Sequence, residues 1–78
     1  MLITVYTKPD CQPCNATKKK LEQLGAEYTL IDVTEDPDAA AAVRELGYLQ
    51  TPVVVVGDIH WSGYSPDKLR WAADATNP

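Results

Sequence analysis

The chain has 78 residues, with 7 basic and 11 acidic side chains and therefore a formal net charge of −4. A chain of this length forms one domain with a modest core, so residues 1–78 are expected to fold as a single domain without large cavities. The acidic balance argues against a nucleic-acid-binding protein, which needs a basic face. No apolar run approaches the roughly 20 residues of a membrane-spanning helix, and no basic and then apolar leader follows Met1. We therefore expect a cytoplasmic protein without nucleic-acid or membrane partners.

The first half of the chain has the pattern of a strand, a helix and a second strand. Residues 2–7 are β-branched and apolar with little alternation, which is typical of a central strand covered on both faces. Less polar side chains recur at helical spacing through residues 12–24, and Gly25 ends this helix. Residues 27–33 form the next strand, and a helical crossover makes the two strands parallel.

The second half adds a helix, a hairpin and a last helix. The second helix begins near Asp36-Pro37, where the missing proline N–H costs nothing. Residues 53–61 contain four valines, a Gly-Asp turn and a short return strand, which is the pattern of a hairpin. Ser65-Pro66-Asp67 combines a capping residue, a proline and an acid, and opens a helix that runs to about residue 75.

Two cysteines, Cys11 and Cys14, lie between the first strand and the first helix. With Cys11 at the N-cap, the Cys14 N–H can point at the Cys11 sulfur, where the helix dipole also favours a thiolate. Cys11 is then the nucleophile and Cys14, one turn further in, resolves the mixed disulfide. The positive charge of Lys8 favours the Cys11 thiolate and lowers its pKa, whereas the negative charge of Asp10 raises that pKa. The net direction of the Cys11 pKa shift therefore stays open. Pro13 stiffens the loop between the sulfurs.

Two other uses of the cysteine pair compete with a redox couple. A tetrahedral zinc site needs four ligands, and the chain offers two cysteines and a single histidine, His60. A structural disulfide across so short a loop constrains the unfolded chain little. A C-x-x-C that follows a strand and opens a helix favours the redox couple. We therefore expect no metal and no bound cofactor beyond the redox-active disulfide itself.

Four local motifs make the whole chain resemble the glutaredoxin branch of the thioredoxin superfamily. They are Lys8-Pro9, Cys11-Gln12-Pro13-Cys14, Thr51-Pro52 and the stretch Trp61-Ser62-Gly63-Tyr64-Ser65-Pro66-Asp67. The last is most similar to the W-S-G-F/Y-x-P-D stretch of NrdH-redoxins. The resemblance implies an α/β thioredoxin fold in its minimal glutaredoxin-like form, with a four-stranded mixed sheet and three helices in the order β-α-β-α-β-β-α.

The same resemblance implies a function and partners. NrdH-redoxins are dithiol-disulfide oxidoreductases that take electrons, originally from NADPH, from thioredoxin reductase and pass them to class Ib ribonucleotide reductase. This chain is expected to be such an electron carrier, working as a monomer. Lys8, Gln12 and Pro13 are then expected to contact the partner beside the cysteines.

Two further segments receive roles from the resemblance. Thr51 would face the cysteines with Pro52 in the cis form, so that the Thr51 main chain can pair with an extended substrate; a proline that only starts a strand is the alternative. Trp61 and Tyr64 would pack with Ser62 and Gly63 to close the glutathione groove, leaving an apolar patch for thioredoxin reductase. A hairpin exit that happens to contain an aromatic residue is the plain alternative.

Two alternative functions stay open. In a glutathione-dependent glutaredoxin, a Gly-Gly-x-x-Asp stretch holds the tripeptide, but here Pro66 stands in place of the acid and Asp67 comes one residue late. Glutathione should therefore bind poorly. In a metal or iron-sulfur carrier, Cys11 from two chains would share a cluster, which Pro13 disfavours by tightening the loop. Pro13 directly precedes the second cysteine, as a proline does in thioredoxins but not in NrdH-redoxins. This placement predicts a couple that is more reducing than that of a glutaredoxin.

Overall fold

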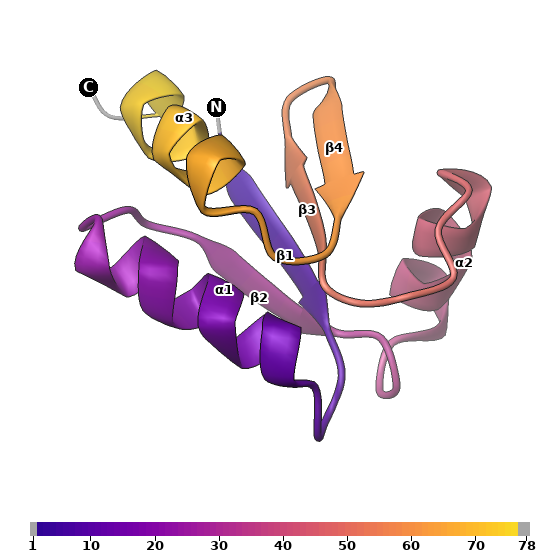
Figure 1. Ribbon diagram of the computed structural model, residues 1–78. Coiled ribbons are helices and arrows are strands. Elements are labelled where there is room, and N and C mark those ends of the chain that lie inside the picture. The colour runs from indigo at the N-terminus through magenta and orange to yellow at the C-terminus, as the bar shows by residue number, and fades with distance from the viewer. Residues whose placement is uncertain (1, 77–78) are drawn as a thin grey trace.

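The computed structural model describes residues 2–76 and has the predicted order of elements (Figure 1). Its strands are β1 (Ile3–Thr7), β2 (Thr29–Asp32), β3 (Val53–Val56) and β4 (Ile59–Ser62), and its helices are α1 (Gln12–Gln23), α2 (Pro37–Glu45) and α3 (Pro66–Thr76). Several ends coincide with the predicted ones, and the others differ by one or two residues. None of the helices in the described part of the chain is both long and apolar enough to span a membrane.

The four strands form one mixed sheet in the order β2-β1-β3-β4. β1 pairs in parallel with β2 and antiparallel with β3, and β3 pairs antiparallel with β4. This confirms the predicted crossover and hairpin. Gly57 has a φ of 60°, the positive value that a two-residue hairpin turn requires at its first position.

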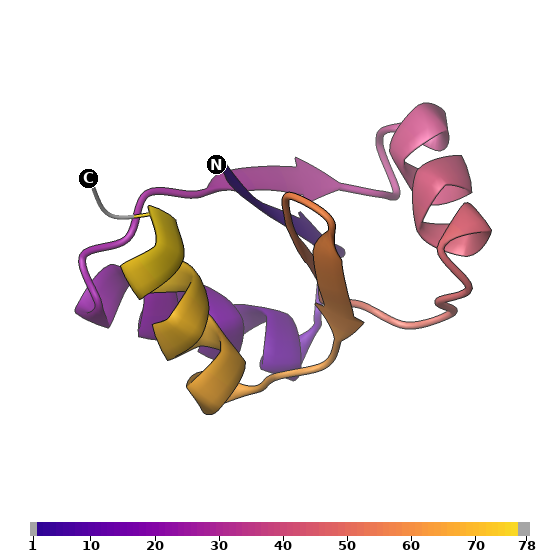
Figure 2. The same ribbon diagram turned by 90° about the horizontal axis from the view of Figure 1, so that it is seen from above.

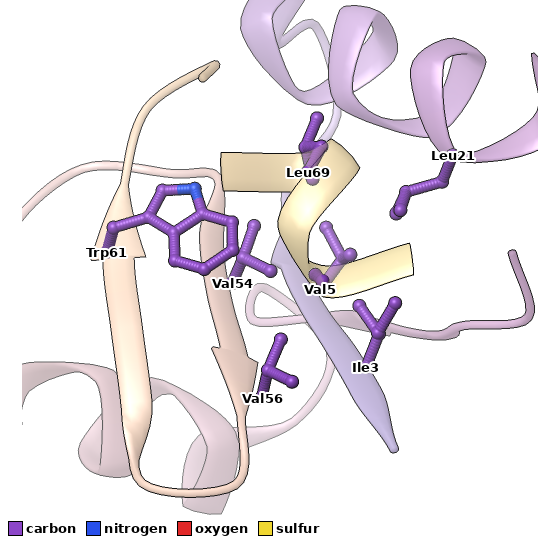
Figure 3. Close-up of a cluster of buried hydrophobic side chains, with 8 residues drawn as sticks. Ile3, Val5, Leu21, Val54, Val56, Trp61 and Leu69 are labelled. Carbon is purple, nitrogen blue, oxygen red and sulfur yellow. The ribbon is translucent and has the colours of Figure 1, made fainter. Parts of the chain in front are cut away.

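One face of the sheet carries the hydrophobic core, which α1 and α3 cover. Figure 3 shows its side chains, which come from β1, β3, β4 and these two helices: Ile3, Val5, Leu21, Val54, Val56, Trp61, Leu69 and Ala72. α2 lies apart from α1 and α3 in both views (Figures 1 and 2). Thr4 and Tyr6, on the opposite face of β1, are half-buried. The expectation that β1 is covered on both faces is therefore confirmed for the face of Ile3 and Val5, whereas the opposite face is only partly covered.

Capping residues fix where the helices begin and end. The Asp36 carboxylate accepts a hydrogen bond from the Ala39 N–H at 3.1 Å and caps α2. After α2, Gly47 has a φ of 93° and donates its N–H to the Arg44 carbonyl, while the Tyr48 N–H bonds to the Val43 carbonyl. This pair of bonds is a Schellman motif. It directs the chain from α2 toward the segment that carries Thr51.

Candidate active site

The two cysteines form a disulfide at the N-terminus of α1. Cys11 is the N-cap in extended conformation, and its Sγ accepts a hydrogen bond from the Cys14 N–H at 3.3 Å. Cys11 is 5% exposed, whereas Cys14 is fully buried. In the reduced protein the same N–H and the helix dipole would face a thiolate on Cys11. Of the two cysteines, Cys11 is therefore the more accessible from outside.

Thr17, a residue that was not predicted to belong to the site, stabilises the first turn of α1. Pro13 lies in that turn, where its lack of an N–H leaves no bond unmade. The Thr17 hydroxyl donates a hydrogen bond to the Pro13 carbonyl at 2.8 Å, and the Thr17 side chain is completely buried. Thr17 therefore supports the peptide between the two sulfurs from inside the fold.

The segment before β3 brings Thr51 and Pro52 against the disulfide. The Thr51-Pro52 peptide bond is cis, as the resemblance implied. The Thr51 hydroxyl donates a hydrogen bond to the Cys11 Sγ at 3.5 Å, and the Thr51 carbonyl oxygen lies 3.7 Å from the same sulfur. Cys11 thus has one donor from its own helix and one from a segment 40 residues away.

Side chains and main chain from β4 and the following loop hold this segment in place. The Ser62 hydroxyl donates to the Gln50 carbonyl at 3.1 Å, and the Gly63 N–H donates to the Pro52 carbonyl at 2.9 Å. Tyr48 Oη lies 2.8 Å from Nδ1 of His60 and 3.3 Å from its carbonyl oxygen, with the two rings edge to face. Ser62 and Gly63 therefore support the Thr51 segment. The His60 contact was not predicted.

The two aromatic residues of the Trp61–Tyr64 stretch occupy different environments. The Trp61 ring is only 4% exposed and points from β4 into the core beside Val54 and Leu69 (Figure 3). Lys68 Nζ lies 5.8 Å from the centre of the ring. Tyr64 is 43% exposed. Trp61 therefore offers little surface to a partner, whereas Tyr64 offers more, and the apolar patch for thioredoxin reductase stays a prediction.

Two grooves share Lys8, and each is lined by one neighbour of Cys11, Asp10 in the first and Thr51 in the second. The first, which we call the β2 groove, measures about 380 Å³ and is lined by Thr7, Lys8, Pro9, Asp10, Asn15, Lys18, Leu30, Asp32 and Glu35. The second, which we call the α2 groove, measures about 310 Å³ and is lined by Lys8, Val33, Ala40, Val43, Arg44, Tyr48, Leu49, Gln50 and Thr51. Charged side chains of both signs line the β2 groove, whereas apolar side chains and two cations line the α2 groove.

Residues beside the cysteines are open to solvent. Lys8, Asp10, Gln12 and Pro13 are all exposed, so each is available to a partner. Asp10 has a φ of 56°, a left-handed conformation that aspartate adopts more readily than most residues. The exposed positions therefore surround a nearly buried sulfur.

Metal ligands do not gather around the cysteines. Within residues 2–76, no group of three or more His, Cys, Asp or Glu side chains is placed to hold a metal ion. His60 lies on β4, beside Tyr48.

Sequence comparison identifies several relatives. The Glutaredoxin family model matches residues 3–61. The glutaredoxin-like protein NrdH of Escherichia coli K12 is 46% identical over 70 residues, which cover 90% of this chain and 86% of that protein. The gene 56 protein of Mycobacterium phage L5 is 39% identical over 69 residues, covering 86% of this chain and 67% of the phage protein.

Solved structures agree with the sequence matches. NrdH-redoxin from Escherichia coli superposes with a TM-score of 0.87 at 42% identity, covering 100% of this chain and 97% of that one. The thioredoxin-like protein BC3987 gives a TM-score of 0.81 at 32% identity, covering 90% and 97% of the two chains. The fold, the disulfide and these relatives together show that the chain belongs to the glutaredoxin family, as a thiol-disulfide oxidoreductase of the glutaredoxin-like NrdH kind.

Proposed function

We propose that this chain is an electron carrier of the cytoplasm, reduced by thioredoxin reductase with NADPH upstream and oxidised by class Ib ribonucleotide reductase. The observation that carries the proposal is the placement of the Cys11 sulfur. It has the Cys14 N–H on one side and the Thr51 hydroxyl on the other. Both donors favour a thiolate in the reduced protein, and a thiolate is the species that attacks a disulfide.

The proposed reaction moves two electrons from the dithiol to the client. The Cys11 thiolate attacks one sulfur of the client disulfide, and the other client sulfur leaves as a thiolate. The Cys14 thiolate then attacks the Cys11 sulfur, and the second client sulfur leaves. The client is reduced and the Cys11–Cys14 disulfide is formed. The complete burial of Cys14 supports this division of roles, because a client disulfide reaches Cys11 first.

The surface around Cys11 supports binding of an extended client segment. In the described part of the chain, neither the N–H nor the carbonyl of Thr51 is bonded to another main-chain group. Such groups can pair with a strand laid beside them. The exposed side chains of Lys8, Gln12 and Pro13 border the same position, and Tyr64 is the remaining aromatic candidate for contact with the reductase.

The position of Asp67 disfavours the glutathione-dependent alternative. Asp67 is the acid nearest to the place where glutaredoxins bind the amino group of glutathione, but it lies in the first turn of α3. Its carboxylate is paired with Arg70. Asp67 also comes one residue later than the acid of the Gly-Gly-x-x-Asp stretch, so glutathione should bind poorly and reduce the protein slowly.

A coupled assay tests the proposal. The oxidised protein is supplied either with NADPH and thioredoxin reductase or with NADPH, glutathione and glutathione reductase, and NADPH loss is followed with an insulin disulfide as substrate. The reductases come from the same organism as the protein. We expect rapid turnover with thioredoxin reductase and slow turnover with glutathione. The reverse order would contradict the proposal and make the protein a glutaredoxin in function.

The iron-sulfur carrier has a separate test. Protein purified without oxygen is analysed for visible absorbance and for bound iron and zinc. We expect neither in stoichiometric amount. A coloured protein with iron bound through Cys11 would contradict the electron-carrier proposal.

A further inference from the structure

The α2 groove is a positively charged site on an acidic protein. The chain has a net charge of −4, yet the groove has Lys8 and Arg44 in its lining and no acidic side chain. Apolar side chains, among them Val43, Tyr48 and Leu49, make up much of the rest. The charge of the groove is thus opposite to that of the protein as a whole, which favours a ligand that is both apolar and anionic.

The groove opens next to the reactive sulfur. Thr51 is part of its lining, and the Thr51 hydroxyl lies 3.5 Å from the Cys11 Sγ. One wall is held in place by the contact of Tyr48 with His60 and by the bond from Ser62 to Gln50. Leu49 is 91% exposed at this wall. A ligand in the groove would therefore meet a preformed surface, and it would lie close to the Cys11 sulfur, which attacks the disulfide of the client.

We propose that the α2 groove binds an extended segment of the client protein that carries a glutamate or aspartate side chain on one side of its attacked cysteine. The inference deepens the proposed function and rests on it. The main chain of the segment pairs with Thr51, an apolar side chain packs on Tyr48 and Leu49, and the carboxylate meets Arg44 and Lys8. An Arg and a Lys at one site give a carboxylate charge-assisted hydrogen bonds.

The second groove gives the segment a direction. On the other side of Lys8, the β2 groove has three acidic side chains, Asp10, Asp32 and Glu35, against Lys8 and Lys18. An acidic side chain entering there would meet like charges. The client should therefore carry its acid on the side of the cysteine that enters the α2 groove, and an acid on the other side should give no gain.

Synthetic peptides test this inference with the pre-reduced, full-length protein. Each peptide has one cysteine joined in a disulfide to thionitrobenzoate, so that attack by Cys11 on the peptide sulfur releases the coloured thiolate. A single glutamate is moved through three positions on each side of the cysteine, and each peptide has a glutamine twin with an amidated C-terminus. Every rate is divided by the rate of the same peptide with dithiothreitol, which removes intrinsic differences in reactivity.

We expect glutamate to raise the rate over glutamine by about threefold at one or more positions on one side only, the size of a solvent-exposed charge pair. The Arg44→Gln variant should bring that ratio close to one, and 0.5 M salt should reduce it. Arg70→Gln is the matched control, because it removes the same charge from α3, where Arg70 is paired with Asp67 outside both grooves. It should leave the ratio unchanged.

Three results would overturn the inference. They are a ratio near one at every position, an equal gain on both sides of the cysteine, and a gain that Arg44→Gln and Arg70→Gln change alike. These results are distinct from failure of the proposed function itself, in which the reduced protein would attack no peptide faster than dithiothreitol does, whatever its charge.

Discussion

Replacement of Trp61 decides whether this residue stabilises the core or binds a partner. The ring is 4% exposed and packs in the core cluster. A buried tryptophan removes about 150–250 Å² from water, which at about 25 cal/mol per Å² corresponds to roughly 4–6 kcal/mol. Measured tryptophan-to-alanine changes in cores cost about 3–5 kcal/mol. We therefore expect Trp61→Ala to lower the free energy of unfolding by about 3–5 kcal/mol.

A loss of this size is large for so short a chain. At roughly 0.05–0.15 kcal/mol per residue, 78 residues give a total stability of about 4–12 kcal/mol. Trp61→Phe is the gentler variant, because it keeps an aromatic ring in the core. It also removes the Trp61 Nε1–H, a buried donor that has no hydrogen-bond partner in the described structure. Loss of that unpaired donor offsets part of the lost packing, so we expect a change within about 1 kcal/mol.

Urea unfolding followed by circular dichroism measures these changes, and the rate of reduction by thioredoxin reductase is measured on each folded variant. Trp61→Phe should keep the rate of the unchanged protein. Tyr64→Ala is the surface control: at 43% exposure it should change stability by less than about 1 kcal/mol. If Trp61→Ala unfolded at the same urea concentration as the unchanged protein but was reduced slowly, Trp61 would be a partner contact and our reasoning would be refuted.

Three further predictions concern the cysteines and their surroundings, and a fourth concerns the cap of α2. Cys11→Ser should abolish disulfide reduction, while Cys14→Ser should accumulate a mixed disulfide with the client, seen by mass spectrometry; equal trapping by both variants would show that the roles are misassigned. Thr51→Val should slow the attack on a small disulfide at neutral pH about two- to fivefold, because the hydroxyl bond to sulfur is lost, and Thr51→Ser should restore it; equal rates in both variants would speak against this role. Asp36→Ala should cost about 1 kcal/mol of stability by urea titration, since the cap of α2 is lost, and no change would mean that the cap is replaced by water. With Pro13 in place the couple should equilibrate near the thioredoxin value of about −270 mV, and a measured value above about −220 mV would contradict this.

The order and type of the elements follow from local patterns. Capping and turn residues act within a few positions of one another, so Asp36 at the start of α2, Gly25 after α1 and the Gly57-Asp58 turn could be interpreted from the sequence. The cysteine geometry is local in the same sense, because the N-cap and the Cys14 N–H are three residues apart. The cis form of the Thr51-Pro52 bond came from resemblance, since its neighbours in space are distant in the chain.

Contacts between distant segments could not be predicted in this way. All four residues of β3 are valines, so the sequence does not show which face of that strand meets the core. Trp61 pairs with Val54, so its burial in the core depends on which face of β3 packs against α1 and α3. The contact of Tyr48 with His60 depends on the exit angle of α2, which the Schellman motif determines. The pattern of polar and apolar residues along a strand does not predict such a contact.

Reconstitution of ribonucleotide reduction shows whether this protein carries electrons to the reductase. Class Ib ribonucleotide reductase from the same organism is supplied with NADPH, thioredoxin reductase and this protein, and deoxyribonucleotide formation is measured over many turnovers. We expect sustained formation that requires all three components and stops when the protein is replaced by its Cys11→Ser variant. Equal formation without the protein, or with Cys11→Ser in its place, would contradict the claim that it carries these electrons.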